Sequence, residues 1–125
     1  MISSDKEGER ILFLKSTPKE IQAVASGEKN IITREIRPAN ARRHVLLNEK
    51  EECTGIIIYD AIKLTSAKVP GASDCVAIKK TMLMEIEDED GSLIHYDHNG
   101  KSYQMVDIDY HLGAILAITG EIPNV

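Results

Sequence analysis

The 125-residue sequence is poor in aromatic side chains. It has no tryptophan, four tyrosines and one phenylalanine. A protein that stacks a series of nucleobases needs a flat ring for each of them. The sequence therefore leaves few candidates for an extended stacking platform, and these are Phe13, Tyr59, Tyr96, Tyr103 and Tyr110.

Cysteines and long apolar runs are equally scarce. Cys53 and Cys75 lack the spacing of a metal site and cannot form a disulfide framework, so we predict free thiols in a reducing compartment. No run approaches the roughly 18 apolar residues that span a membrane, and MISSDKEGER at the start has no apolar signal core. We expect a cytoplasmic protein without a membrane partner. Residues 1–10 are predicted to be a flexible lead-in and residues 11–122 a single domain.

Positive charge is also limited, but it is concentrated in one segment. The formal net charge is -5. Residues 29–44 contain five Lys or Arg and one Glu, which gives +4 and leaves -9 for the remainder. The total argues against nonspecific adhesion to nucleic acid, whereas the segment predicts a local anion-binding surface.

Regular elements are predicted with clear boundaries in the first third of the chain. Ile11 to Lys15 is an apolar run of strand length, consistent with burial on both faces. A helix should follow, with Thr17 as N-cap, Pro18 in its first turn, Glu20 completing a capping box and Gly27 ending it.

The remainder of the chain reads mainly as strands. From Ile31 the period is two, so Ile32, Arg34 and Ile36 share one face, and Pro38 ends the strand. Further strands are predicted at 55–64, 75–86 and 114–120, with a short helical turn around 42–47. A type I′ turn at Asn99 and Gly100 would set Tyr96 opposite Tyr103. We predict an α+β fold, a small mixed β-barrel of about six strands with one clear N-terminal helix.

The segment GEKNIITREIRP, followed later by YDAIKL and HLGAILAI, resembles the ASCH family of PUA-like barrels. Members carry Gly-x-Lys-x-x-Glu-x-Arg between helix and strand. Gly27, Lys29 and Arg34 match, whereas Ile32 stands at the Glu position. The resemblance covers roughly residues 11–120 and implies a cleft, between the first helix and the barrel, that binds RNA or a nucleotide-like ligand.

The residues themselves also have structural explanations. Gly27 is accounted for as a helix stop, and Lys29 as a solvated cation near the helix end. Arg34 shares a face with isoleucines and needs an anionic partner, which is either a ligand phosphate or an internal ion pair with Asp60. Arg37, with Arg42 and Arg43, would form an outer basic rim. The predicted ligand-binding residues are thus Gly27, Lys29, Arg34, Arg37 and Asp60.

No cofactor or metal is predicted. His95, Asp97, His98, Asp107, Asp109 and His111 are suitable ligand types, but the hairpin register turns His98 away from His95 and Asp97. Asp88, Asp90 and Gly91 resemble a calcium loop only superficially, since the required glutamate is missing.

Three functions are compatible with this pattern. The first is a module that binds RNA or a nucleotide, without a basic recognition helix for duplex DNA. The second is a hydrolase, since some ASCH-like proteins are amidohydrolases on acylated cytidine nucleosides or ribonucleases. That resemblance implies Lys29 as the catalytic residue, but Ile32 replaces the expected threonine and Thr33 and Glu35 lie on the other face. The third is a regulatory domain that binds a small acidic metabolite.

Overall fold

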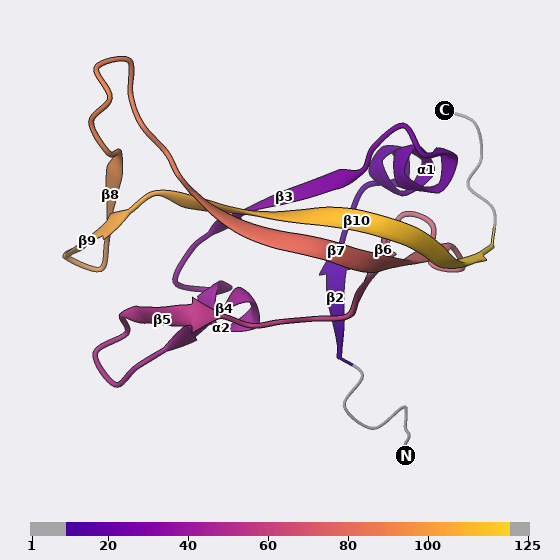
Figure 1. Cartoon of the computed structure of the whole chain (residues 1–125), viewed down its shortest axis with the longest axis horizontal. Helices are drawn as coiled ribbons and strands as arrows, with labels where there is room; N and C mark the ends of the chain where they lie inside the picture. The colour runs from indigo at the N-terminus through magenta and orange to yellow at the C-terminus, as the bar shows by residue number, and fades with distance from the viewer. Residues whose placement is uncertain (1–9, 121–125) are drawn as a thin grey trace. The chain divides into compact units, whose positions relative to one another are not determined.

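A computed structural model describes residues 10–120 of the chain (Figure 1). Most of the predicted lead-in, 1–9, and the last residues of the predicted domain, 121–122, lie outside the described residues. Within them the elements in chain order are β2 (Ile11–Lys15), α1 (Pro18–Ser26), β3 (Ile31–Ile36), α2 (Ala41–His44), β4 (Val45–Leu47), β5 (Cys53–Ile56), β6 (Ala61–Thr65), β7 (Ser73–Glu85), β8 (His95–His98), β9 (Lys101–Gln104) and β10 (Val106–Thr119).

The chain divides into two compact units. Within the described residues, unit 1 contains 10–32, 58–80 and 111–120, and unit 2 contains 33–57 and 81–110. Strands β3, β7 and β10 each contribute residues to both units. Neither unit is therefore a continuous stretch of sequence.

The strands form a mixed α+β fold that is mostly β. Five of them make one sheet in the order β2-β6-β7-β10-β3, and β4-β5 and β8-β9 are two-stranded. In residues 10–120, β2 and β3 are the outer strands of the five-stranded sheet, which is not closed. The α+β class is confirmed, and the closed barrel is not. The predicted six strands become nine in the described chain, because short strands form in segments expected to be connections.

Unit 1 contains the first strand and helix as predicted. Thr17 caps α1 by accepting a hydrogen bond from the Glu20 amide at 3.1 Å, Pro18 begins it, and Gly27 ends it with φ of 84°. Strand β2 pairs in parallel with β6. The buried apolar side chains of β2, α1 and β6 are Leu12, Leu14, Ile21, Val24, Ala61, Ile62 and Leu64.

Two expectations about the strands are wrong. Strand β2 is buried on one face only, because Phe13 is 58% exposed on the other. The strand predicted over residues 55–64 is broken: β5 ends at Ile56 and β6 begins at Ala61. The Asp60 carboxylate accepts the Arg10 amide at 2.8 Å, and the Arg10 carbonyl accepts the Asp60 amide at 2.8 Å. These bonds to a neighbouring segment replace a continuous strand ladder.

Unit 2 contains the predicted hairpin. Strands β8 and β9 pair with Tyr96 opposite Tyr103, and the turn residues Asn99 and Gly100 have φ of 53° and 78°. Two positive φ values define a type I′ turn. Asparagine and glycine tolerate that conformation, so the sequence set this register correctly. Part of the expected helical turn is also present, as α2, which passes into β4 at Val45.

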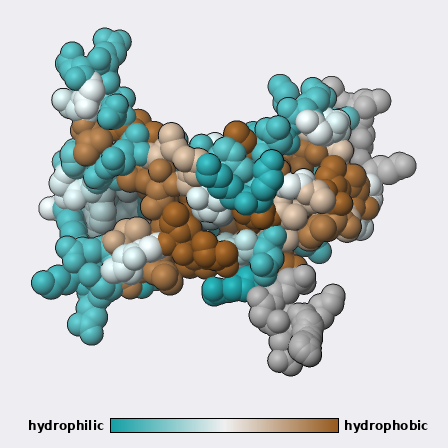
Figure 2. Space-filling model, viewed as in Figure 1, coloured by the Kyte–Doolittle hydropathy of each residue, from teal (hydrophilic) through white to brown (hydrophobic). Residues whose placement is uncertain are grey.

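Apolar side chains also reach the surface (Figure 2). In unit 1 they cluster along the last part of β10, where Ile115, Leu116 and Ile118 are between 42% and 56% exposed. None of the helices in residues 10–120 has the length and apolar character required to cross a membrane.

Candidate functional site

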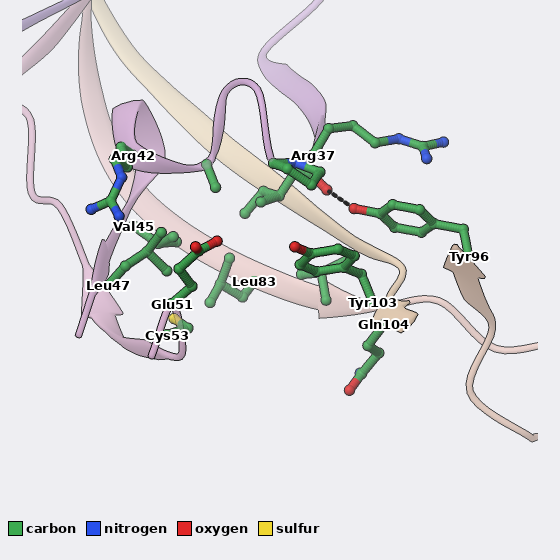
Figure 3. A pocket seen from close by; sticks show the side chains of 14 residues that line it. Arg37, Arg42, Val45, Leu47, Glu51, Cys53, Leu83, Tyr96, Tyr103 and Gln104 are labelled. Atoms are coloured by element: carbon green, nitrogen blue, oxygen red, sulfur yellow. Dashed lines mark hydrogen bonds between the residues drawn. The ribbon is translucent and has the colours of Figure 1, made fainter. Parts of the chain in front are cut away.

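Unit 2 contains a hollow of about 300 Å³. It lies within the size range of small-molecule sites. The strands β3, β4, β5, β7, β8, β9 and β10 and the helix α2 all contribute to its wall (Figure 3). The lining residues are Ile36, Arg37, Pro38, Ala41, Arg42, Val45, Leu47, Glu51, Cys53, Leu83, Tyr96, Tyr103, Gln104 and Val106.

Aliphatic side chains make up about half of this wall. Val45 is fully packed in the core of unit 2, and Ile36, Leu83 and Val106 are half-buried. They come from four different strands, which are β4, β3, β7 and β10 in that order. An apolar wall of this kind accepts the faces of a flat ring but not a hydrated ion.

Two tyrosines form one side of the hollow. The rings of Tyr96 and Tyr103 stack with centroids 5.7 Å apart and planes 21° apart. Their cross-strand pairing in β8 and β9 explains this contact. The Tyr96 hydroxyl donates to the Ile36 carbonyl at 3.4 Å, which fixes the outer ring. The Tyr103 hydroxyl points into the hollow (Figure 3).

A glutamate faces the tyrosines. The Glu51 carboxylate and the Tyr103 hydroxyl point toward one another across the hollow (Figure 3). Glu51 has a positive φ of 63°, which is unusual for a residue other than glycine and costs about 1 kcal/mol. Asn48 stabilises this turn, because its side-chain oxygen accepts the amides of Lys50 and Glu52, both at 2.9 Å. The β4–β5 turn thus holds an acceptor at the hollow in a strained conformation.

Two arginines of the predicted basic rim line the same hollow. The Arg37 guanidinium lies 4.2 Å above the Tyr96 ring and forms an ion pair with Glu35. The exposed Arg42, on α2, makes no hydrogen bond or ion pair with any side chain in residues 10–120. Arg43 follows it on α2 but does not line the hollow. Arg42 is therefore the cation of this wall that remains available to an anion.

Positive charge around α2 also affects a buried histidine. Burial, and the nearby charges of Arg43 and Arg34, lower the pKa of His44 to about 4. The imidazole Nδ1 is 2.6 Å from the Tyr110 hydroxyl, and both residues are buried. His44 is thus a neutral residue of the core, next to the exposed Arg43 in the sequence.

The remaining predicted residues are in other surroundings. Gly27 and Lys29 belong to unit 1, where the Lys29 ammonium lies 2.9 Å from the Glu20 carboxylate. Glu20 also accepts the Ser16 hydroxyl. The Lys29 ammonium is thus paired with a carboxylate of the first turn of α1, and it is not the solvated cation at the helix end that the structural explanation expects. Its role in ligand binding or catalysis stays a prediction.

Arg34 and Asp60 belong to different units. Arg34 is half-buried in β3, as the strand phase predicts, and its guanidinium donates to the Thr33 carbonyl at 3.0 Å. Asp60 is engaged by the Arg10 backbone. Arg37 is thus the one predicted ligand-binding residue that lines the hollow of unit 2.

Sequence reasoning missed Glu51, Gln104 and the aliphatic wall. The tyrosine pair was predicted as a sheet contact and not as part of a site. The one available signal was the polar run around Asn48, which is typical of a turn but does not predict a positive φ at a glutamate. In residues 10–120, no three His, Cys, Asp or Glu side chains are grouped closely enough to hold a metal ion.

The comparisons with known proteins assign the chain to no family. No family model, no curated protein and no solved structure matches the chain. The resemblance to the ASCH family therefore remains a prediction based on the residues of the motif.

Proposed function

We propose that this protein is a binding module for a nucleotide, either free or as one residue of single-stranded RNA, and that the base enters the hollow of unit 2. The observation that carries this proposal is that the Tyr103 hydroxyl and the Glu51 carboxylate face each other across an apolar hollow of about 300 Å³. Arg42 supplies the charge for a phosphate at the rim.

The hollow suits a base better than an aliphatic metabolite. A base is flat and packs against a tyrosine ring and aliphatic side chains, and such stacking contributes about 1–3 kcal/mol. Its edge carries N–H donors, and a carboxylate accepts from the exocyclic amine of cytosine or adenine. Glu51 would take that role, whereas the Gln104 amide already donates to the Glu85 carboxylate at 2.7 Å.

The arginines suit the phosphate. A guanidinium binds a phosphate through two parallel hydrogen bonds. Arg37 already interacts with Glu35 and Tyr96, so it positions the tyrosines. Arg42 makes no hydrogen bond or ion pair with a side chain of residues 10–120. A small acidic metabolite would use Arg42 equally well but would leave the tyrosines and Glu51 without a role.

The family resemblance points in the same direction. This support comes from Gly27, Lys29 and Arg34 of the ASCH motif alone. The hydrolase alternative has less support, because Lys29 is paired with Glu20 and the threonine position is Ile32.

Calorimetric titration with the four 5′-ribonucleoside monophosphates tests the proposal. We expect saturable binding, strongest for a base with an exocyclic amine. Tyr103→Leu should weaken it at least about tenfold through lost stacking, whereas Tyr103→Phe, which keeps the ring, should retain most of it. Glu51→Gln should reduce the preference among bases. The control ligand is ribose 5-phosphate, which lacks the base.

Arg42→Gln and Arg43→Gln form a matched pair, since both remove one exposed charge from α2 and only Arg42 lines the hollow. With a single-stranded ribo-oligonucleotide, Arg42→Gln should reduce the salt slope of the affinity by about one, and Arg43→Gln should leave it nearly unchanged. Equal binding of ribose 5-phosphate and nucleotide, or equal effects of the two substitutions, would refute a base-binding hollow.

A further inference from the structure

Unit 1 has a hollow of its own, of about 350 Å³. It is bordered by α1, by the start of β7 and by the end of β10. The lining residues are Ile21, Gln22, Ala25, Ala72, Asp74, Ile118, Thr119 and Gly120. Apart from Asp74, Gln22 and Thr119, this wall consists of aliphatic side chains and glycine.

Asp74 is the unusual member of the wall. Its side chain is 1% exposed, and both carboxylate oxygens are buried without a hydrogen-bond partner among residues 10–120. Burial raises the pKa of Asp74 from 3.8 to about 6. A carboxylate in this state is costly, because a buried charge normally has a partner that replaces its lost hydration.

The backbone around Asp74 is fixed. Its strand pairs with β6, with Leu64 opposite Asp74, so the residue cannot turn outward without disrupting the ladder. Gly120 has φ of 73°, and a side chain there would collide with the Gly71 carbonyl. The exposed Gln22 on α1 is the long, flexible member of the wall. Because both Asp74 oxygens are buried, an ammonium group reaches them only when a side chain of the wall moves, and Gln22 is the exposed, flexible one.

We propose that the hollow of unit 1 binds a primary ammonium group on an aliphatic stem, with Asp74 as its counter-ion. The ammonium would donate to the two unpartnered carboxylate oxygens, and the stem would lie against Ile21, Ala25 and Ile118. The Thr119 hydroxyl or the Gln22 side-chain oxygen can accept the third N–H. A single carboxylate with apolar walls suits an amine better than a metal ion, which needs several oxygen ligands.

Backbone amide chemical shifts in NMR, recorded at pH 7.5 where Asp74 is ionised, test this proposal. The probe is n-butylammonium chloride, and n-butanol and tetramethylammonium chloride are controls of similar size. We expect saturable shifts at Gln22, Ala72, Asp74 and Thr119 with n-butylammonium alone. Equal shifts with butanol would show an apolar hollow only, and equal shifts with tetramethylammonium would show charge attraction without hydrogen bonds. Either result, or no saturation up to about 50 mM, would overturn the proposal.

The matched variant is Asp74→Asn, which preserves the shape and removes the charge. We expect it to weaken n-butylammonium binding at least about tenfold, as loss of a charge-assisted hydrogen bond does. A second measurement does not depend on the variant: n-butylammonium should lower the pKa of the Asp74 carboxyl, followed by its ¹³C shift. Unchanged affinity in Asp74→Asn, or an unchanged carboxyl pKa, would exclude Asp74 as the counter-ion. Nα-acetyl-lysine amide is a further ligand that mimics the lysine side chain of a protein. Tighter binding than that of n-butylammonium would indicate a protein lysine as the ligand, and equal or weaker binding would indicate a free amine.

Discussion

The side chain of His44 illustrates how burial fixes a protonation state. It is 1% exposed, and burial together with Arg43 and Arg34 lowers its pKa from 6.5 to about 4. As the pH falls below about 6.5 the unfolded chain gains a proton here, whereas the folded protein gains it only near pH 4. His44 therefore contributes stability above pH 6.5, on the order of 2 to 3 kcal/mol, that is lost progressively toward pH 4.

This gives a prediction for NMR. The ring carbon and nitrogen signals of His44 should remain those of a neutral imidazole between pH 7.5 and pH 5.5. The reason is that a protonated imidazole would be buried beside Tyr110 and close to the positive charges of Arg43 and Arg34. A midpoint near the ordinary histidine value, about 6.5, would contradict the burial described for this residue.

Asp74 has the opposite pH dependence. Its folded pKa, about 6, is higher than the ordinary 3.8, so the folded protein retains the proton more tightly than the unfolded chain. Stability from this group is greatest below pH 3.8 and declines as the pH rises to about 6, above which it is constant. The loss is on the order of 2 kcal/mol.

Asp74→Asn should remove that decline, because asparagine does not ionise. Measured by urea unfolding, the stability of the variant relative to the parent protein should rise by about 2 kcal/mol between pH 4 and pH 7. The comparison between the two pH values cancels any constant cost of burying the amide. A difference that does not change with pH would mean that the carboxyl is solvated or paired in solution.

At the scale of elements, α1 is short and depends on its ends. It has nine residues, too few for a stable helix without packing and caps. Thr17→Ala removes the acceptor for the Glu20 amide and should reduce the unfolding free energy by about 1 kcal/mol, whereas Thr17→Ser, which keeps the hydroxyl, should cost much less. Equal losses in the two variants, measured by chemical denaturation, would show that the methyl group matters and the cap does not.

Elements with local signals could be predicted from the sequence. The cap at Thr17, the stop at Gly27 and the turn at Asn99 and Gly100 each depend on neighbouring residues, and all three are confirmed. The break after Ile56 has no local signal, and within it Asp60 forms hydrogen bonds with Arg10. Those partners are 50 positions apart in the sequence.

The candidate site was less predictable than the fold. Arg37 and Arg42 were expected on a basic rim, and the Tyr96–Tyr103 pair was expected from the hairpin register. These arginines and tyrosines line one hollow together with Glu51. This arrangement depends on how β3, α2 and the two hairpins pack in unit 2. Periodicity assigns a residue to a face of its own strand, but it carries no information on which distant strand end lies opposite.

At the scale of the whole molecule, the two candidate sites are lined by different kinds of side chain. The hollow of unit 2 combines tyrosines, arginines and a glutamate, whereas that of unit 1 is aliphatic around one carboxyl. A nucleotide and an amine differ in charge, so the two proposals predict distinct ligands. Arg42→Gln should leave amine binding unchanged, and Asp74→Asn should leave nucleotide binding unchanged.

The interleaved chain path of the two units has a practical consequence for protein engineering. Because β3, β7 and β10 each pass from one unit into the other, no single truncation separates them. An isolated copy of the hollow of unit 2 would have to be built as a fusion of residues 33–57 with 81–110 through an artificial linker. A protease cut anywhere within 58–80 would fall inside a segment of unit 1. Each of the two resulting fragments would still contain segments of unit 1 and of unit 2.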